Sequence, residues 1–311
     1  MSTSTANFAD QDGVIWYDGR MVPWREANTH VLTHTLHYGC GVFEGIRLYD
    51  GAQGPAIFRL REHLIRLFHS AKIIDMQIPY DMETLEQACK QAVQQNQLIN
   101  GYLRPMAFWG AENMGIHGEH LKTHVIVAAW DWGRVMGEEA RTRGIKVKTS
   151  TIRRHDVNSL MVKAKVNGHY VNSILAMREA KNCQCDEALL LDQQGFVAEG
   201  SGENFFMVRD GVVYTPDRST ILEGITRDTV IQFCQEMSIP LVECHITRDQ
   251  VYMADEAFFT GTAMEILPIR ELDGRSIGEG QRGPLTEALQ QRYFATVEGH
   301  LSEYHSWLTV V

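Results

Sequence analysis

The 311-residue sequence lacks features that define several large classes of protein. No apolar run approaches the ~20 residues needed to cross a bilayer, and the first residues, MSTSTANFADQDG, carry neither a basic region nor an apolar core. The formal net charge is −10 and the pI is near 5.7, which argues against a nucleic-acid partner. We therefore expect a cytoplasmic protein that acts on small molecules and binds neither nucleic acid nor membrane.

Residues that bind metals do not occur at useful spacings either. The six cysteines form no pair of CxxC units, and Cys183 and Cys185 are typical of reduced thiols near a helix end. His30, His34 and His37 recur at helical spacing, but no carboxylate stands at ligand spacing beside them. The sequence therefore predicts no metal site.

The length of the chain exceeds what one hydrophobic core usually spans, so two domains are expected. Hydrophobic residues make up 44% of the chain and charged residues 22%, as in globular proteins. The composition becomes charged at RVMGEEARTRG. We place an interdomain loop over 134–144 there, between an N-terminal domain over 1–133 and a C-terminal domain over 145–311.

The N-terminal part is predicted to combine short strands with two amphipathic helices. Asp18-Gly19 suits a tight turn between two strands. The glycines at 39, 41 and 45 in HTLHYGCGVFEGIRLYD imply tight backbone, and a bent strand with a packed aromatic residue is the alternative. A first helix begins near Arg59, with an apolar face formed by Leu60, Leu64, Leu67, Ala71 and Ile74. A second helix over about 82–95 precedes two strands, GYLRPMAFWG and THVIVAAW, and the loop 111–122 separates those strands.

The C-terminal part is predicted to contain more strands. IKVKTSTIRR alternates as a strand, and hairpin turns follow at Gln194-Gly195 and at 209–211. The strand EAFFTGTAMEILPI is interrupted at Gly261. A helix over about 166–181 is predicted to bury an apolar face formed by Tyr170, Val171, Ile174 and Leu175. The last helix, over 284–298, is predicted to pack through Leu285, Leu289 and Phe294.

Lys165 is the first candidate for chemistry, because it lies among apolar and small residues in VKAKVNGHYVNSI. An amine with such neighbours loses hydration, which disfavours its charged form, and a neutral amine forms Schiff bases with carbonyl compounds. An ordinary exposed lysine remains the alternative on local sequence alone. Lys163, two residues away, is the next candidate amine.

Glu199 is the second candidate, at the end of a predicted strand that runs into Gly200, Ser201 and Gly202. A carboxylate at such a place, followed by glycines that let the backbone approach a ligand, suits a buried cationic ring. Farther along, a loop that ends at Gly224 starts a helix near Thr226. The free N–H groups of that helix suit a phosphate, although an ordinary capped helix has the same pattern.

Taken together, these motifs closely resemble the branched-chain aminotransferases, members of the fold-type IV family of pyridoxal 5′-phosphate (PLP) enzymes. The resemblance covers essentially the whole chain, and several separated motifs match in order, among them HYG with VFEGIR, HLIRL, GYLRP, the Lys165 stretch and EGSGEN. It implies an α/β fold (α+β in two domains). The small N-terminal domain would be α/β, and the larger C-terminal domain would be β-rich and bind PLP.

The resemblance implies a role for each candidate cofactor residue. Lys165 is implied to hold PLP covalently, Glu199 to pair with its pyridine nitrogen, and Arg66 to bind its phosphate. Tyr170 is implied to contact the phenolic oxygen. The other cofactor-binding residues implied are Leu222 against the ring, and Ile225, Thr226 and Thr262 at the phosphate.

The same resemblance implies a substrate pocket. Tyr102 and Arg104 share one face of a predicted strand, because side chains alternate. Tyr102 is implied to lie near the α-carboxylate and Arg104 near the distal carboxylate of glutamate. The pocket is implied to include Tyr38, Phe43, Met114, Ile116 and Trp132, partly across a dimer interface, with Thr262 and Ala263 at the substrate carboxylate.

The implied activity is transamination between leucine, isoleucine or valine and 2-oxoglutarate, by a homodimer or a multiple of dimers. A D-amino acid aminotransferase or an aminodeoxychorismate lyase of the same fold is the alternative, which the Tyr102-x-Arg104 and HYG...VFEGIR motifs disfavour. A non-catalytic α/β protein and a cofactor-free Schiff-base lyase are the alternatives from other classes. Val135 and Glu223 depart from the family pattern, which predicts an altered pocket shape and a less rigid loop.

Overall fold

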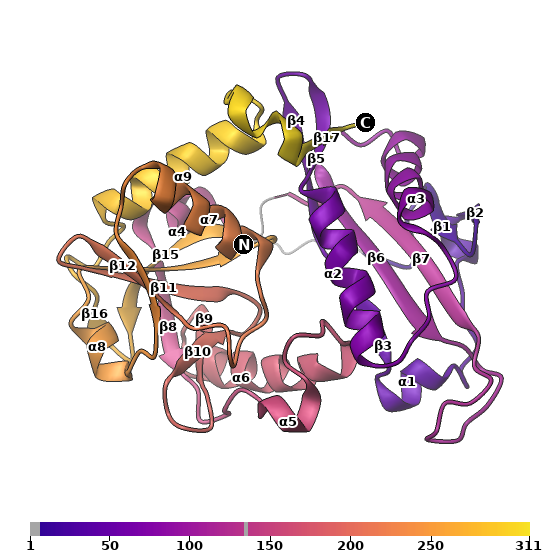
Figure 1. The fold of residues 1–311 in the computed structure, drawn as a ribbon, viewed down its shortest axis with the longest axis horizontal. Coiled ribbons are helices and arrows are strands. Elements are labelled where there is room, and N and C mark those ends of the chain that lie inside the picture. The colour runs from indigo at the N-terminus through magenta and orange to yellow at the C-terminus, as the bar shows by residue number, and fades with distance from the viewer. Residues whose placement is uncertain (1–6, 134–135) are drawn as a thin grey trace. The chain divides into compact units, whose positions relative to one another are not determined.

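The computed structural model describes residues 7–133 and 136–311, which form two compact units (Figure 1). Unit 1 contains the described residues up to Gly133 together with Ala164–Gly168 and Glu303–Val311, and unit 2 contains the rest of the described chain. Continuous domains over 1–133 and 145–311 stay a proposal. Unit 1 includes two short segments from later in the chain, and one of these carries Lys165.

Unit 1 is built on an antiparallel sheet whose described strands run in the order β17-β5-β4-β6-β7-β1-β2, with β3 paired to β6. The predicted turn between β1 and β2 is confirmed, because Asp18 and Gly19 have φ values of 48° and 91°. Two successive residues with positive φ make the tight turn that suits the twist of a hairpin. The strands are β1 (Val14–Tyr17), β2 (Arg20–Pro23), β3 (Gly41–Phe43), β4 (Ile46–Gly51), β5 (Gly54–Phe58), β6 (Gly101–Trp109), β7 (Thr123–Trp130) and β17 (Leu308–Val310).

Helices α2 (Leu60–Ile73) and α3 (Met82–Gln95) lie against this sheet (Figure 1). Both predicted helices are confirmed, and α3 has the predicted bounds. Its first turn is capped by Asp81, whose side chain accepts a hydrogen bond from the N–H of Thr84 at 2.8 Å. The predicted apolar face of α2 is buried, with Leu60, Leu64, Leu67 and Ala71 at most 2% exposed. Burial of each leucine stabilises the fold by about 1.5–3 kcal/mol.

Unit 2 is built on a mixed sheet with the order β10-β9-β8-β15-β14-β11-β12-β13, and β16 pairs with β15. Because β10 also pairs with β11, the path from β10 through β8 and β14 to β11 closes on itself as a barrel. The strands are β8 (Ile145–Thr149), β9 (Glu187–Leu191), β10 (Val197–Gly200), β11 (Asn204–Arg209), β12 (Val212–Pro216), β13 (Leu241–Cys244), β14 (Glu256–Gly261), β15 (Glu265–Leu272) and β16 (Arg275–Ser276).

The predicted hairpins of unit 2 are confirmed, and so is a helix that starts near Thr226. The interruption at Gly261 is also confirmed, because β14 and β15 pair around the turn that holds Thr262 and Ala263. The helices of unit 2 are α4 (Glu138–Arg143), α5 (Val157–Leu160), α6 (Tyr170–Asn182), α7 (Ile225–Glu236), α8 (Arg248–Tyr252) and α9 (Pro284–Val297). Among the described residues, none of the helices combines the length and the apolarity that a bilayer requires.

A bent strand, the alternative for HTLHYGCGVFEGIRLYD, forms only in the second part of this stretch, as β3 and β4. The residues His34–Tyr38 form the short helix α1, and Gly39, with φ 71°, ends it before β3 begins. A residue with positive φ at this position is the usual end of a helix, and glycine adopts it without strain. Two short 3-10 helices complete the N- and C-terminal segments, Trp24–Glu26 and Ser302–Trp307, and a third, Asn167–His169, precedes α6.

The predicted buried face of α6 was wrong. Val171, Ile174 and Leu175 are 45% to 60% exposed, and Tyr170 is half-buried. The buried side chains are Ser173, Ala176 and Ala180, the last two in one cluster with Ala188 and Leu190 of β9. Small residues let a helix approach a strand closely, so the larger apolar residues remain on the outer face.

The interdomain loop predicted over 134–144 contains α4. Glu138 and Glu139 lie in its first turn, and Arg141 and Arg143 in its last, so the charges complement the helix dipole. The two arginines also pair with Glu138 and Glu139 across one turn. The charged composition that suggested a loop therefore favours a short helix. Residues 134 and 135, and with them the predicted departure at Val135, lie outside the described residues.

Candidate active site

Lys165 is held by its backbone within unit 1. Its N–H donates a hydrogen bond to the Oγ of Ser70 on α2 at 2.9 Å, and its carbonyl accepts one from the N–H of Phe43 at 3.1 Å. The next residue, Val166, forms an antiparallel bridge with Val42. These contacts explain why the five residues Ala164–Gly168 belong to unit 1 although the chain on both sides belongs to unit 2.

The side chain of Lys165 lies beside an aromatic ring that also meets a second cation. Its Nζ is 5.3 Å from the centre of the Phe43 ring, and the guanidinium carbon of Arg104 is 4.7 Å from the same centre. Such contacts stabilise a cation over a ring face. They place the Lys165 amine and the Arg104 guanidinium beside one aromatic residue.

Lys163, the alternative amine, has a different environment in unit 2. Its Nζ is 3.1 Å from a carboxylate oxygen of Glu223 and 3.2 Å from the carbonyl of Ile221, and it also contacts the carbonyl of Arg218. These three acceptors hold the Lys163 side chain within unit 2, whereas the Nζ of Lys165 lies beside the ring of Phe43 in unit 1.

Arg66 on α2 is fixed by a buried carboxylate. Its Nε and Nη2 donate to the two carboxylate oxygens of Glu44, at 2.7 and 2.9 Å, and Glu44 is fully buried. His63 Nδ1 lies 2.7 Å from the same carboxylate. A bidentate pair of this kind fixes the plane of the guanidinium.

The protonation states around Arg66 follow from burial and charge. Burial alone would raise the pKa of Glu44, but the charge of Arg66 and the hydrogen bonds from Arg66 and His63 hold that pKa well below its usual range. Burial lowers the pKa of His63, against the opposing effect of Glu44. Glu44 is therefore ionised near neutral pH, and a neutral His63 donates its Nδ1–H to it. We call Phe43, Glu44, His63, Arg66, Ser70 and Lys165 the lysine cluster.

Tyr102, Arg104 and Trp132 adjoin the lysine cluster through Phe43. Tyr102 and Arg104 lie on the same side of β6, and the ring of Trp132 meets that of Tyr102 edge-on at 4.7 Å. The Nε of Arg104 is buried without a hydrogen-bond partner among the described residues. A guanidinium with an unused donor in aromatic surroundings is suited to an incoming anion. Gly45 is needed beside Tyr102, because a Cβ there would lie 1.9 Å from the tyrosine oxygen.

Of the other predicted pocket residues of unit 1, Tyr38 and Met114 contact each other. The hydroxyl of Tyr38, on α1, donates to the carbonyl of Met114 in the loop 111–122, at 3.1 Å. Tyr38 is 46% exposed and Ile116 is 81% exposed. These apolar side chains therefore lie on the surface of the single chain.

Glu199 lies in unit 2, at the pairing of β10 with β11. Its Oε1 is 2.6 Å from the Nε of Arg154, and its Oε2 accepts hydrogen bonds from Asn204 Nδ2 at 3.1 Å and from the N–H of Leu222 at 3.2 Å. Glu199 and Arg154 are only 6% and 8% exposed. An arginine, an amide and a backbone N–H thus fix the position of this carboxylate. We call Arg154, Glu199, Asn204 and Leu222 the glutamate cluster.

Asn204 connects the glutamate cluster to the start of α7. Its Nδ2 also donates to the carbonyl of Leu222, and its Oδ1 would lie 1.9 Å from a Cβ at position 224. Only glycine fits there. Gly224 is the N-cap of α7 and gives no side-chain cap, so Ile225 and Thr226 begin the helix with free N–H donors.

Each unit by itself offers groups whose chemistry suits PLP. Unit 1 has an amine and an oriented guanidinium, which suit an aldehyde and a phosphate. Unit 2 has a buried carboxylate and an uncapped helix start, which suit a pyridinium nitrogen and a phosphate. Tyr170 begins α6, and Thr262 and Ala263 lie half-buried in the turn after β14. The described residues contain no group of three histidine, cysteine, aspartate or glutamate side chains placed to hold a metal ion.

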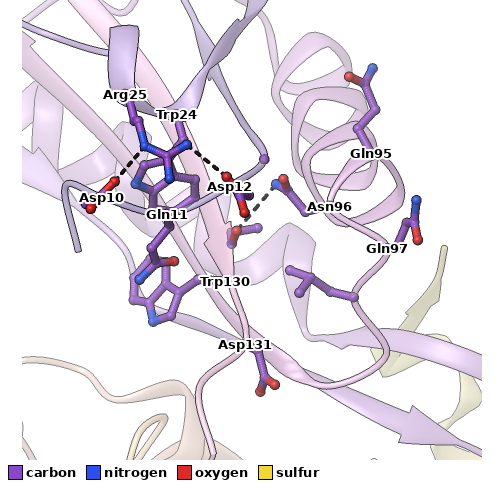
Figure 2. Close-up of a pocket in the computed structure, with 13 residues that line it drawn as sticks. Asp10, Gln11, Asp12, Trp24, Arg25, Gln95, Asn96, Gln97, Trp130 and Asp131 are labelled. Carbon is purple, nitrogen blue, oxygen red and sulfur yellow. Dashed lines mark hydrogen bonds and ion pairs between the residues drawn. The ribbon is translucent and has the colours of Figure 1, made fainter. Parts of the chain in front are cut away.

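A separate cavity of about 510 Å³ in unit 1 is lined by none of the candidate site residues. Figure 2 shows Arg25 between Asp10 and Asp12, with Nε and Nη1 at 2.6 and 2.8 Å from their carboxylates. Asn96 on the opposite wall bonds the backbone of Val14. The polar groups of this cavity therefore fasten the N-terminal segment.

Comparison with known proteins places the chain in a family. Residues 41–272 match the family described as amino-transferase class IV. The branched-chain-amino-acid aminotransferase of Pseudomonas aeruginosa is 57% identical over 98% of this chain and 99% of its own length. The chain belongs to the class IV aminotransferases, in their branched-chain group. The resemblance inferred from the sequence motifs is thereby confirmed.

Solved structures agree with this membership. The T.th. branched-chain amino acid aminotransferase complexed with N-(5′-phosphopyridoxyl)-L-glutamate has a TM-score of 0.92 at 48% identity. The same enzyme complexed with 4-methylvaleric acid has a TM-score of 0.93 at 48% identity. Both alignments cover 96% of this chain and 99% of the solved one. The predicted fold class, a fold-type IV α/β fold with two domains, is confirmed.

Glu223, at which a less rigid loop was expected, forms an ion pair. Its carboxylate lies 3.1 Å from the Nζ of Lys163, and its side chain is 55% exposed. This ion pair connects the loop before α7 to Lys163.

Five residues of the two clusters were not among the predicted site residues, namely Glu44, His63, Ser70, Arg154 and Asn204. Ser70 stands four residues after Arg66 on α2, so helical spacing alone would have placed both on one side. Glu44 and Asn204 lie inside quoted motifs, VFEGIR and EGSGEN. Arg154 follows β8 in an irregular segment, where no spacing indicates its contact with Glu199.

Proposed function

We propose that this protein is a PLP-dependent transaminase that moves the amino group between leucine, isoleucine or valine and 2-oxoglutarate. The products are branched 2-oxo acids and L-glutamate. The observation that carries the proposal is the placement of the Lys165 amine and the Arg104 guanidinium on the ring of Phe43. The amine of Lys165 suits the reaction with the cofactor aldehyde, and the guanidinium of Arg104 suits the distal carboxylate of glutamate.

The cofactor supplies a protonated aromatic ring that accepts the electron pair left at the substrate Cα. Lys165 is proposed to hold it covalently, and Glu199 to keep the ring nitrogen protonated. The charge of Arg154 beside Glu199 favours the carboxylate form that this role needs. Arg66 is proposed to bind the phosphate, and Tyr170 the phenolic oxygen. The remaining cofactor contacts are assigned to Leu222, Ile225, Thr226 and Thr262.

Lys165 has a second proposed task once the substrate amine has displaced it. Its free Nζ would accept the proton from the substrate Cα and would donate a proton to the C4′ carbon of the bound cofactor. The backbone of Lys165 stays fixed by Ser70 and Phe43 during this exchange. One amine can then serve as base and acid for both halves of a ping-pong cycle.

Substrate selection is proposed to combine an apolar wall with one cation. Tyr102 is assigned to the α-carboxylate and Arg104 to the distal carboxylate of glutamate. The T.th. enzyme was solved with a phosphopyridoxyl-glutamate compound and with 4-methylvaleric acid, a carboxylic acid with a branched apolar chain. The wall is assigned to Tyr38, Phe43, Met114, Ile116 and Trp132, with Thr262 and Ala263 at the carboxylate.

We further propose a homodimer or a multiple of dimers that works in the cytoplasm on small molecules. The apolar face of α5 and α6 supports this, because its side chains are between 44% and 60% exposed on the single chain. They are Val157, Leu160, Met161, Val171, Ile174 and Leu175. Sedimentation equilibrium should give a dimer-based mass. A dimeric mass that persists in Ile174→Glu would move the interface away from α6.

A donor panel tests the function most simply. The PLP-loaded protein is assayed with L- and D-amino acids against 2-oxoglutarate, and glutamate is measured. Turnover with L-leucine, L-isoleucine and L-valine is expected. Turnover confined to D-amino acids, or release of product without glutamate formation, would point instead to the D-amino acid aminotransferase or the lyase of the same fold.

A further inference from the structure

Ser70 combines full burial with a hydrogen bond to a distant segment. Its side chain lies on α2 and is 0% exposed. Its Oγ accepts the hydrogen bond from the N–H of Lys165, a residue 95 positions later in the chain. This is a side-chain contact to the backbone of the residue that carries the reactive amine, so it bears on the direction in which that amine points.

The same helix carries Arg66 and His63, which both contact the carboxylate of Glu44. His63, Arg66 and Ser70 follow one another at helical spacing, so they lie on one side of α2. Arg66 and Ser70 are four residues apart, which corresponds to about 6 Å along the axis. One rigid element therefore positions both the guanidinium, which is locked by Glu44, and the hydroxyl that receives Lys165.

The backbone of Lys165 is constrained from two directions. The Oγ of Ser70 accepts a hydrogen bond from the N–H of Lys165, and the N–H of Phe43 donates one to the carbonyl of Lys165. With both peptide groups fixed, the position of the amine is left to the side-chain torsions of Lys165 alone. Without the serine oxygen, a largely buried N–H would have no acceptor on α2, and the segment Ala164–Gly168 would move to find one.

We propose that Ser70 is a positioning residue that holds Lys165 for covalent capture of the cofactor aldehyde. The inference rests on the proposed function, because it takes Lys165 as the amine that binds PLP. Ser70 itself touches neither cofactor nor substrate in this account. It acts through the peptide N–H of Lys165, at a fixed spacing from the phosphate-binding Arg66.

The test compares two cofactor forms on the apo protein. PLP carries the aldehyde that Lys165 captures, whereas pyridoxamine 5′-phosphate offers the same phosphate and ring without it. In Ser70→Ala, stopped-flow absorbance should show capture of PLP slowed by roughly 10- to 100-fold, the scale of a misplacement near 1 Å. The affinity for pyridoxamine 5′-phosphate should equal that of the wild type.

A matched pair isolates the hydroxyl from side-chain size. Ser70→Thr and Ser70→Val add similar bulk to a packed position, but only threonine keeps an oxygen acceptor. The threonine variant should capture PLP faster than the valine variant. Ser173→Ala on α6 removes another buried serine hydroxyl and should leave capture unchanged. This comparison remains decisive if Ser70→Ala proves too unstable to purify.

Each result decides the matter. If Ser70→Ala binds PLP and pyridoxamine 5′-phosphate more weakly by the same factor, Ser70 serves folding alone. If the rate of PLP capture is unchanged in Ser70→Ala, Ser70 has no role in it. Either result overturns the inference. The Lys165→Ala variant separates this from the proposed function. If that variant still captures PLP covalently, another amine is the reactive one, and both the assignment of Lys165 and the role of Ser70 fall. If it does not, a negative result with Ser70 leaves the proposed function intact.

Discussion

Replacement of Arg104 by leucine should separate the two half-reactions of the enzyme. The guanidinium of Arg104 lies 4.7 Å from the centre of the Phe43 ring, and its Nε is buried without a hydrogen-bond partner among the described residues. Its other near neighbour is the ring of Tyr102 at 5.6 Å. In aromatic surroundings the distal carboxylate of glutamate would gain a charge-assisted hydrogen bond from this group. Leucine is apolar, so the variant removes the cation without adding a new polar group.

The magnitude follows from the worth of such a bond. A hydrogen bond to a charged group contributes about 1.5–3 kcal/mol, which corresponds to roughly 10- to 100-fold in a rate constant. The loss should fall on the half-reaction with glutamate or 2-oxoglutarate. Leucine has no distal charge, so the half-reaction with leucine should change much less. Arg104→Lys keeps the charge but loses the planar guanidinium. Its rate constant in the half-reaction with glutamate should therefore lie between those of the wild type and of Arg104→Leu.

Stopped-flow absorbance on the PLP and aminated forms measures each half-reaction by itself. The account requires unequal losses, large with glutamate and small with leucine. Equal losses in both half-reactions would mean that Arg104 binds the α-carboxylate common to all substrates or supports the fold. The dual-substrate reasoning would then be wrong.

Three further predictions follow from other parts of the structure. Lys165→Ala should remain folded and abolish turnover with leucine, measured by glutamate formation, and near-normal turnover would transfer the role to Lys163. Arg66→Ala should lower the affinity for PLP, measured by titration of the apo variant, more than it alters the preference among amino donors, because a phosphate contact is common to every donor. An unchanged affinity for PLP would leave Arg66 with only its ion pair to Glu44. Burial and the charge of Arg154 lower the pKa of His155 to about 3 from its ordinary 6.5, so between these values the unfolded chain binds a proton that the folded chain does not. The free energy of unfolding should therefore fall from about pH 7 to about pH 5, and denaturant titrations of His155→Gln should show a smaller fall, whereas an equal fall in both proteins would rule out this contribution.

Local patterns predicted most of the elements. The apolar spacing of α2 and the bounds of α3 are consequences of the 3.6-residue period, and the hairpin turns at Asp18-Gly19 and 209–211 follow from residues that tolerate positive φ. In these places the local preference and the tertiary structure agree. The sequence therefore indicated the elements without knowledge of their neighbours.

The burial of α6 could not be predicted from periodicity alone. Its apolar residues define one face, but the small residues Ser173, Ala176 and Ala180 pack inward. Close approach to β9 favours small side chains, and this depends on a strand that comes later in the chain. Apolar periodicity identifies an apolar face and does not say whether it meets the core or another molecule.

The candidate site was predictable where the chemistry resides in motifs. The roles assigned to Lys165, Arg66 and Glu199 rest on such motifs and stay predictions. The residues that orient them, such as Ser70 and Arg154, are separated from them by 95 and 45 positions. Contacts over such separations are set by how strands and helices pack, so the sequence alone gave no signal for Arg154 and only a helical spacing for Ser70.

The covalent attachment of the cofactor tests the central proposal most directly. The PLP-loaded protein is reduced with borohydride, digested and mapped by tandem mass spectrometry that distinguishes Lys163 from Lys165. The account predicts a single phosphopyridoxyl group, attached to Lys165, and loss of the yellow colour. A label on Lys163 or another lysine, or no label on a protein that nevertheless transaminates, would contradict it.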